Sequence, residues 1–364
     1  MKKERFLIIV SMILLISVGL LMIYSSSSVW SVYKFNTRFR YLIYQTFFLV
    51  VGTMCLLFTK KIDLDFLKRK TNLIFFISVF LLVLVLIPGI GKIRNGSRSW
   101  FSLGFISFQP SELMKMSLIM FTSKYLEKYH QRINNIKNNL LPLILIIFMV
   151  LFLIMLEPDF GSSMIIVLTI TIMLFTAKLD IKYFIYLGIV GLLGISVIIL
   201  IAPYRMARIV SFLNPWSDPL GSGYQIIQSL YAIGPGGIFG HGLFSSRQKY
   251  FYLPEPQTDF IFAILCEELG LIIAGFVIIL FIMLFYNIFI VSYKESDLFK
   301  KFIVIGIGSS LAIQTVMNLS VVVGLVPVTG VTLPFLSYGG SSLLISMVSI
   351  GIILNISKQG KHWC

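Results

Sequence analysis

Apolar residues gather in long runs along this chain, and short segments rich in charged residues separate the runs. Most runs approach the roughly 20 residues that a helix needs to cross about 30 Å of hydrocarbon. The pattern therefore predicts an all-α polytopic membrane protein with about ten transmembrane helices. The runs lie near residues 6–28, 41–59, 72–89, 110–126, 140–156, 160–177, 183–202, 260–291, 302–326 and 339–357.

The composition supports a membrane protein. Of the 364 residues, 57% are hydrophobic and 12% are charged, whereas about a quarter of an ordinary soluble domain is charged. The first run follows the basic start MKKER, as in a signal peptide, but it is long and further runs follow it. We therefore predict an uncleaved first span. The three cysteines, Cys55, Cys266 and Cys364, form no C-x-x-C motif, and they predict neither a disulfide framework nor a metal site.

The net charge of +15 would suggest a nucleic-acid partner in a soluble protein, but here the charge follows the loops. With the N-terminus in the cytoplasm, the inner segments hold 19 Lys and Arg residues and the outer segments hold 10. Positive charge concentrates on the cytoplasmic side of membrane proteins. We therefore predict a multi-pass protein of the cytoplasmic membrane with both termini cytoplasmic, and no nucleic-acid partner.

The largest outer segment, about residues 203–259, lies between the seventh and eighth predicted helices. Glycine and proline interrupt it, yet it also carries many apolar residues and Trp216. Long loops in compact proteins are usually functional or disordered, and apolar content argues against disorder. We expect this extracytoplasmic loop to fold against the membrane surface, as part of a single transmembrane domain over residues 1–364.

Ionisable residues near the outer ends of the predicted helices are candidates for chemistry. Glu112 and Lys115 follow Pro110 and share one helix face, about one turn inside the membrane. Such a pair normally faces a cavity or the bundle interior, so it forms a buried salt bridge, the polar lining of a substrate groove, or both. Glu157 and Asp159 are expected to cap an outer turn and the next helix, with ligand contact as the alternative.

Asp259 lies where the long outer loop becomes the eighth predicted helix. Thr258 is the expected N-cap, so Asp259 would open the helix and either complement its dipole or act on a ligand. Glu267 and Glu268 lie deeper, and we expect them to make buried polar contacts with neighbouring helices. The loop 326–342, with two prolines and three glycines, is expected to supply shape rather than an acid or base.

Six distinctive stretches follow one another between about residues 94 and 342: NGSRSWF, QPSELMK, EPDFGSS, LNPWSDPLGSGYQIIQSLYAIGPGGIFGHGL, LPEPQTDFIFAILCEELG and VTGVTLPFLSYGGSS. In this order, and with the ten-span layout, they resemble the SEDS family (shape, elongation, division and sporulation), within the branch of FtsW and stage V sporulation protein E. One departure is Phe244, which stands where a small residue is expected after the G-x-G-L pattern.

The resemblance implies a peptidoglycan glycosyltransferase. Such an enzyme polymerises lipid II, the undecaprenyl-pyrophosphate-linked disaccharide pentapeptide, on the outer face of the cytoplasmic membrane. The resemblance also implies a class B penicillin-binding protein (transpeptidase) as partner, and a role in cell division, spore cortex synthesis or both. The aspartate of the family's TDF motif is its catalytic carboxylate, and this role passes to Asp259.

This reaction needs a base for a sugar hydroxyl proton and cations for the departing pyrophosphate. We expect Arg98 and Arg208 to bind the substrate, with Glu112 and Lys115 lining the site at greater depth. Each arginine could instead anchor anionic lipid headgroups. No cofactor is certain, although a divalent cation could assist the pyrophosphate. The other outer cations are Arg205, Arg247 and Lys249.

Two other functions remain open at this point. A lipid II flippase would call for ionisable residues through the full membrane depth and a repeat-based architecture, whereas the acids here concentrate in the outer half. A non-catalytic scaffold for the penicillin-binding protein would make Asp259 dispensable for polymerisation.

Overall fold

A computed structural model describes residues 1–364 except 95–96, 104–105, 202–205, 207–209 and 360–364. Within the described residues, a helix covers each of the ten predicted runs, which confirms the helical membrane fold. These helices are α1 (Lys2–Phe35), α2 (Arg40–Thr59), α3 (Leu64–Leu86), α4 (Pro110–Tyr129), α5 (Leu141–Leu156), α6 (Phe160–Thr176), α7 (Ile181–Ile201), α10 (Ile261–Tyr293), α11 (Leu298–Val322) and α12 (Gly340–Gln359).

Seven helices in the described part of the chain are long and apolar enough to cross a membrane. They are α1, α2, α3, α5 together with the turn Ile136–Leu140 before it, α10, α11 and α12. Of the other three, α6 has 17 residues, α7 offers a short apolar stretch over Ile181–Gly194, and α4 carries five charged residues. The polar character of α4 fits a helix enclosed by others rather than one that faces lipid.

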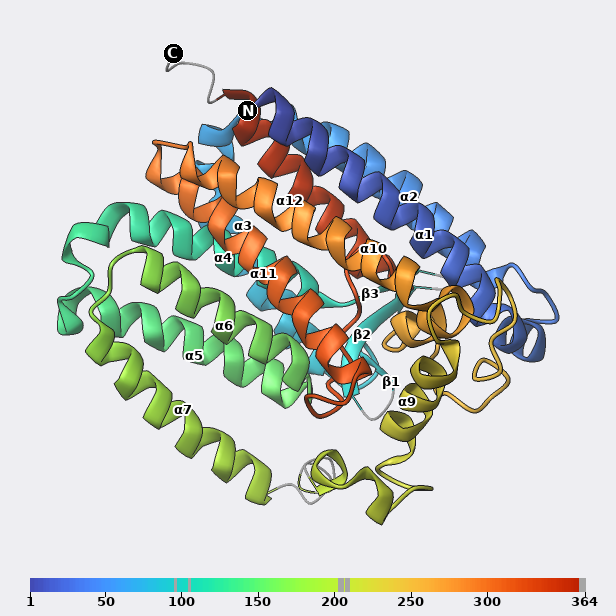
Figure 1. Cartoon of the computed structure of the whole chain (residues 1–364). Helices are drawn as coiled ribbons and strands as arrows, with labels where there is room; N and C mark the ends of the chain where they lie inside the picture. The colour runs from blue at the N-terminus through green and yellow to red at the C-terminus, as the bar shows by residue number, and fades with distance from the viewer. Residues whose placement is uncertain (95–96, 104–105, 202–205, 207–209, 360–364) are drawn as a thin grey trace.

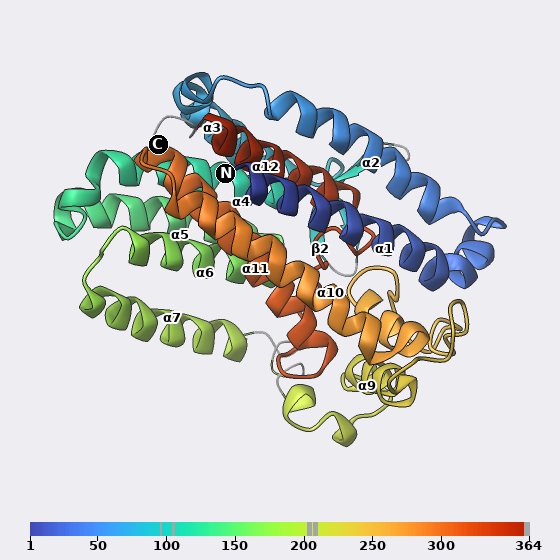
Figure 2. The ribbon, with the colours of Figure 1, turned by 45° about the horizontal axis from the view of Figure 1, so that its top comes forward.

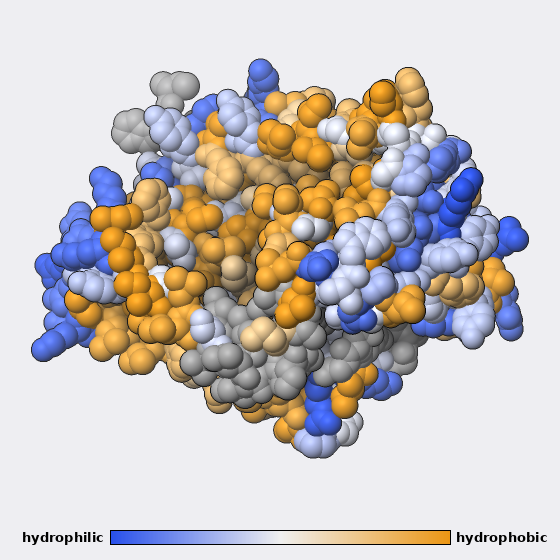
Figure 3. Space-filling view, turned by 60° about the horizontal axis from the view of Figure 1, so that its bottom comes forward, coloured by the Kyte–Doolittle hydropathy of each residue, from blue (hydrophilic) through white to orange (hydrophobic). Residues whose placement is uncertain are grey.

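The N-terminus and the C-terminal end of α12 lie at one end of the helix bundle, and the short strands and α9 (Tyr224–Gly236) lie at the other end (Figure 1, Figure 2). On the face that Figure 3 shows, apolar residues form a broad band between these ends, and hydrophilic residues gather at the two ends. Such a band is what a hydrocarbon layer requires. The arrangement agrees with termini on one side of the membrane and the large loop on the other.

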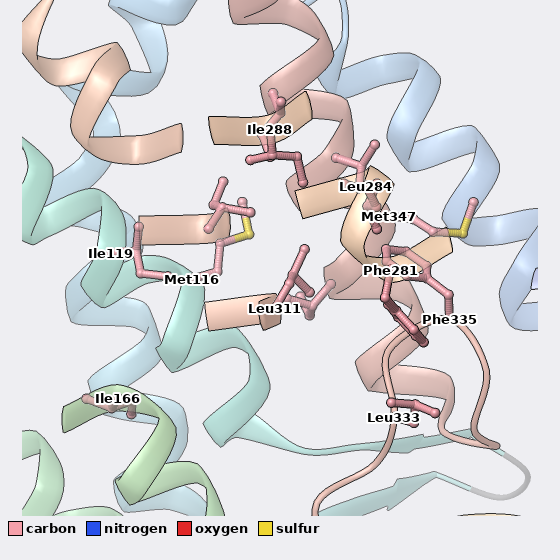
Figure 4. Packing of buried hydrophobic residues seen from close by; sticks show 14 of the residues in the cluster. Met116, Ile119, Ile166, Phe281, Leu284, Ile288, Leu311, Leu333, Phe335 and Met347 are labelled. Carbon is pink, nitrogen blue, oxygen red and sulfur yellow. The ribbon is translucent and has the colours of Figure 1, made fainter. Parts of the chain in front are cut away.

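The central helices of the bundle are α11 and α12. In the most apolar 18-residue stretch of each of these two helices 72% of the residues are buried, compared with 28% in the corresponding stretches of α2 and α3. α12 packs against α2, and α11 packs against α4, α6 and α10. Met116 of α4, Leu311 of α11 and Leu284 of α10 belong to the shared core, which Figure 4 shows from close by. The helices that carry the candidate residues are thus held by the best-packed part of the molecule.

A three-stranded antiparallel sheet joins α3 to α4, and the hydropathy pattern did not predict it. Strand β2 (Ser97–Leu103) pairs with β1 (Lys92–Arg94) and with β3 (Ile106–Phe108). β1 and β3 have only three residues each, and the sequence of β2, SRSWFSL, does not alternate between apolar and polar residues. The sheet leads directly into Gln109 and α4, so it fixes the polar N-terminus of α4 at the same end as α9.

The loop 203–259 is ordered over the part that the structure describes, as its apolar content predicts. It contains a short 3₁₀ turn (Pro215–Ser217) and then α9, which packs against α10. The Ser229 hydroxyl of α9 donates a hydrogen bond to the Val322 carbonyl at the end of α11, at 2.7 Å. α9 is therefore attached to the helix bundle rather than free above it.

α10 is interrupted at Gly270, whose φ of 73° and ψ of 180° lie outside the helical region. The chain after α9 fills the break: the amides of His241 and Gly242 donate to the carbonyls of Glu267 and Glu268, at 3.0 and 2.9 Å. A Cβ on Gly240 would lie 2.3 Å from the Glu268 carbonyl oxygen. Glycine at this position therefore lets the two backbones touch.

Candidate active site

Asp259 lies in a turn immediately before α10 rather than inside the helix. The N-cap of α10 is Phe260, so the prediction that Thr258 caps this helix is wrong. The Thr258 hydroxyl donates instead to the Glu255 carbonyl, at 3.1 Å. The alternative to a catalytic role is that Asp259 complements the dipole of α10, and its position one residue before the N-cap leaves both roles open.

The backbone around Asp259 is held by two distant parts of the chain. The side-chain amide of Asn318, in α11, donates to the carbonyls of Asp259 and Val331, at 2.8 and 2.7 Å. The Ser337 hydroxyl donates to the Thr258 carbonyl at 2.6 Å. The position of Asp259 is therefore fixed by the bundle core and by the loop 326–342, and not by its own helix.

The loop 326–342 also passes beside the Asp259 carboxylate. A Cβ added to Gly330 would lie 3.8 Å from Asp259 Oδ2. Gly330 has a φ of 74°, a conformation that glycine adopts without strain. The amide of Tyr338 in the same loop donates to the Gln257 carbonyl at 2.9 Å. The loop shapes the surroundings of the carboxylate, in line with the role expected from its sequence.

Glu112 and Lys115 form the predicted ion pair. Lys115 Nζ lies 2.9 Å from Glu112 Oε1, and the two side chains are 6% and 11% exposed. Lys115 also donates to Gln314 Oε1 at 2.9 Å, and Gln314 Nε2 donates to the Thr332 carbonyl at 3.0 Å. The pair is thus a buried salt bridge, as one of the two expected roles requires. It also connects through Gln314 to the loop beside Asp259.

Asp159 caps α6, as predicted: its Oδ1 accepts a hydrogen bond from the Ser162 amide at 2.9 Å. Its Oδ2 accepts from the Gln109 side-chain amide and the Ser111 hydroxyl, at 3.0 and 2.9 Å. The backbone N–H of Gln109 donates to the Ser341 hydroxyl at 3.1 Å. Asp159 therefore joins the N-terminal ends of α4 and α6, which lie close to the start of α12.

Glu157 does not cap a helix in the way expected for it. It follows the last residue of α5, and its side chain is fully buried. Neither carboxyl oxygen has a hydrogen-bond partner within the described part of the chain. Burial raises the pKa of this carboxyl to about 9, and the charge of Asp159 adds to the increase. Glu157 is therefore a neutral acid at pH 7.

The outer cations differ in their burial and in their hydrogen-bond partners. Arg98 is half-buried, and its guanidinium donates to the Leu86 carbonyl at the end of α3, at 3.4 Å. Arg208 lies outside the described residues, as does Arg205. Arg247 is exposed. Lys249 is 3% exposed and pairs with Glu268 at 3.0 Å.

Gln314 and Asn318 also belong to the candidate site, although the hydropathy pattern and the motifs did not point to them. They are buried, at 3% and 1% exposure, and they lie one turn apart on the same face of α11. Their amides hold the two segments that surround Asp259 and Lys115. The signal was present in the sequence, because two amide side chains four residues apart are unusual inside a long apolar run.

The described residues contain no group of three or more His, Cys, Asp or Glu side chains that could hold a metal ion. Glu112, the carboxylate nearest to Lys115, is already paired with that lysine. A divalent cation that assists the pyrophosphate stays a prediction, because one or two carboxylates together with substrate phosphates are also able to hold such an ion.

Comparison with known proteins relates this arrangement to one family. The family model described as cell cycle protein, of the FtsW/RodA/SpoVE type, matches residues 5–362. The chain is similar to stage V sporulation protein E of Bacillus subtilis (strain 168), with 47% identity over 356 residues, 98% of this chain and 97% of that protein. It is also similar to the probable peptidoglycan glycosyltransferase FtsW of Coxiella burnetii, with 39% identity over 358 residues, 98% of this chain and 96% of that protein.

Two solved structures share the fold. A chain in a peptidoglycan synthase complex that coordinates polymerization and crosslinking has a TM-score of 0.78 and 26% identity, with 100% of this chain and 99% of that chain covered. The rod shape determining protein RodA of Thermus thermophilus has a TM-score of 0.72 and 24% identity, with 98% and 97% covered. The second similarity concerns the fold alone.

Proposed function

This chain belongs to the FtsW/RodA/SpoVE family, and we propose that it is a peptidoglycan glycosyltransferase that polymerises lipid II on the outer face of the cytoplasmic membrane. Relatives that align over nearly the whole chain carry that activity in their names. The chain is a multi-pass membrane protein, as a lipid-linked substrate requires. Its role is in cell division, spore cortex synthesis or both.

We propose Asp259 as the general base. Its carboxylate takes the proton of an acceptor sugar 4-hydroxyl as that oxygen forms a bond to an anomeric carbon. The bond from the anomeric carbon to the polyprenyl pyrophosphate breaks, and the pyrophosphate leaves with the electron pair. A positioned base contributes about 10²–10⁴-fold to such a step.

The observation that carries this assignment is that hydrogen bonds from distant residues fix the backbone at Asp259. Asn318 and Ser337 fix the carbonyls of Asp259 and Thr258, and Gly330 passes beside the carboxylate. A base contributes fully only when it is placed before the substrate arrives. Two separate parts of the chain, α11 and the loop 326–342, maintain this placement, which is more than a residue with a purely surface role would need.

The departing pyrophosphate needs positive charge in a partly dehydrated site. Lys115, buried and linked through Gln314 to the loop beside Asp259, is the best-placed described cation for this role. Glu112 keeps that ammonium group oriented. Arg98 and Arg208 remain proposals as substrate-binding residues on the outer side. We propose no step through a divalent cation.

We propose that the partner is a class B penicillin-binding protein, the transpeptidase that would crosslink the new glycan strand. The support is the match over the whole chain to a component of a peptidoglycan synthase complex that coordinates polymerization and crosslinking. A partner of this kind would meet the strand on the same side of the membrane as α9 and Asp259.

Purified protein, reconstituted with lipid II and with or without its penicillin-binding protein, tests this function directly. Glycan chains longer than the disaccharide are expected, and they should depend on Asp259. Transfer of lipid II across liposome membranes with no polymer would indicate a flippase instead. Polymer formation that requires only the partner would indicate a scaffold.

A further inference from the structure

Two adjacent acids in α10, Glu267 and Glu268, have no part in the proposed chemistry. Both are buried, at 2% and 0% exposure, and both lie immediately before the break at Gly270. Burying carboxylates is costly unless hydrogen bonds and opposite charge compensate. Their contacts therefore indicate what they stabilise.

Glu268 gathers four donors from two other parts of the chain. The Ser25 hydroxyl of α1 donates to it at 2.7 Å, and Lys249 Nζ lies 3.0 Å from its Oε1. The amides of Phe244 and Ser246 donate to its two oxygens, each at 3.1 Å. This carboxylate is satisfied on both oxygens, which is the condition under which a buried ion pair is well tolerated.

Glu267 binds the same segment from the neighbouring position. Its Oε2 accepts from the Ser246 hydroxyl at 2.5 Å, and its Oε1 accepts from the Arg247 amide at 2.8 Å. Lys249 completes the set, since its Nζ also donates to the Phe244 carbonyl at 2.6 Å. We call Ser25, Lys249, Glu267 and Glu268 the Glu268 cluster.

The Glu268 cluster joins three elements: α1, α10 and the segment 244–249 of the outer loop. That segment continues into a short connection that ends at Asp259. Along it, the Leu253 amide donates to the Gln248 carbonyl at 3.0 Å, and the Leu253 side chain is fully buried. At the far end, Ser337 and Tyr338 hold the carbonyls of Thr258 and Gln257. The connection is thus fixed at both ends.

Removal of one member would leave the others unsatisfied in a dry site, so the network responds as a unit. The loop amides of 244–247 would lose the carboxylates that order them. Buried polar groups of this kind are best known for selecting one register among several. Here the register concerned is that of the loop 244–259 against α10.

We propose that the Glu268 cluster is a positioning device, in which Ser25, Lys249 and Glu268 set the register of the loop 244–259 and thereby the position of Asp259. Its members are buried and bonded to one another, so they act as positioning residues. The proposal rests on the proposed function, with Asp259 as the base.

The test compares Lys249→Met, Glu268→Gln and the double variant with Lys68→Met. Lys68→Met is the control, because Lys68 also forms an ion pair, with Glu127 at 2.5 Å, but the pair is partly exposed and lies on the side predicted to be cytoplasmic. For each reconstituted protein, kcat and KM for lipid II polymerisation are measured, together with amide hydrogen exchange over residues 244–259.

A base displaced by about 1 Å costs on the order of 10²-fold in rate. We therefore expect kcat to fall by about 10–100-fold in each single variant, with KM for lipid II unchanged and faster exchange over 244–259. The double variant should lose less than the product of the two single losses. Lys68→Met should keep the wild-type kcat and the wild-type exchange over this segment.

Wild-type kcat and wild-type exchange over 244–259 in Lys249→Met or Glu268→Gln would overturn the proposal. If Lys249→Met does not fold, Glu268→Gln carries the same test, since it keeps the shape of the side chain. Asp259→Asn is measured in parallel. Full activity of Asp259→Asn would refute the proposed function itself, a result distinct from the failure of the positioning proposal.

Discussion

The ion pair between Glu112 and Lys115 is buried, and Gln314 extends it to the loop beside Asp259. Its two members depend on each other, because each would be an unpaired charge in a low-dielectric region without the other. Loss of one partner of a buried pair typically costs about 3–5 kcal/mol. The pair can therefore be tested as a unit.

Glu112→Ala and Lys115→Ala should each lower the free energy of unfolding by about 3–5 kcal/mol and reduce polymerisation. The double variant should lose less than the sum, because no unpaired charge remains. A double-mutant cycle on stability and polymerisation rate measures this coupling. Strictly additive losses in folded, membrane-inserted protein would contradict the pairing.

Glu157 makes the stability of the protein depend on pH. Its carboxyl has a pKa of about 9 in the folded chain, compared with 4.5 as the unperturbed value. Between these values the folded state binds more protons than the unfolded state, so the free energy of unfolding falls as pH rises. Below about pH 4.5 both states are protonated, and the effect disappears.

Glu157→Gln should remove this dependence, because glutamine keeps the shape of the neutral acid and cannot ionise. Thermal unfolding of the two proteins is compared at pH 5 and pH 8. The variant is expected to gain stability relative to the wild type, and to gain more at pH 8 than at pH 5. An equal difference at both values would show that Glu157 is ionised in the folded protein.

Among the elements, α10 has the most demanding geometry, since its break at Gly270 receives the chain that follows α9. A Cβ on Gly270 would lie 2.3 Å from the Ile238 carbonyl oxygen. Residues other than glycine also rarely adopt a backbone conformation with φ of 73° and ψ of 180°. Both the contact and the dihedral angles require glycine.

Gly270→Ala should therefore destabilise the protein, by about 1–3 kcal/mol from the backbone conformation alone and more from the contact with Ile238. Gly275→Ala in the same helix is the control. A Cβ there meets nothing within 4 Å, and alanine is better than glycine in a helix interior by about 1 kcal/mol. The thermal stability of both variants is measured; if Gly270→Ala were as stable as Gly275→Ala, the break in α10 would not exist as described.

The helices could be predicted from the sequence because hydrocarbon thickness sets their length and composition along the chain itself. The pairing of Glu112 with Lys115 and the cap made by Asp159 were also predictable, because in each case the partners lie three residues apart in the sequence. The break at Gly270 could not be predicted, because the segment that fills it, around Gly240 and His241, belongs to the loop after α9. The Thr258 cap was wrong because the chain remains in a turn through Asp259, and Phe260 is the N-cap of α10.

The whole molecule carries the proposed chemistry at one end. α9 and β2 lie at the end of the bundle opposite the N-terminus (Figure 2), and Asp259 directly precedes α10, which packs against α9. The excess of Lys and Arg in the inner segments predicts that the termini are cytoplasmic. This orientation decides which face of the membrane the substrate must reach.

Single cysteines at Ser222 and Asn135, both exposed, test the orientation. They are introduced as Ser222→Cys and Asn135→Cys into a chain whose own cysteines are replaced by serine. An impermeant thiol reagent on intact cells should label the first and not the second. Labelling at Asn135 alone would reverse the orientation and place Asp259 in the cytoplasm.

The central claim is that Asp259 acts as a base rather than as a structural residue. Asp259→Asn keeps the shape of the side chain but cannot accept the proton of the acceptor hydroxyl. Glu255→Gln is the control, because it changes a carboxylate four residues away and leaves the proposed base intact.

The decisive measurement is the rate of lipid II polymerisation by purified Asp259→Asn, in the presence of its partner and beside Glu255→Gln. We predict normal expression and partner binding for both variants. We also predict a rate at least about 10²-fold lower for Asp259→Asn alone, the usual contribution of a positioned base. Polymerisation by Asp259→Asn at close to the wild-type rate would contradict the mechanism.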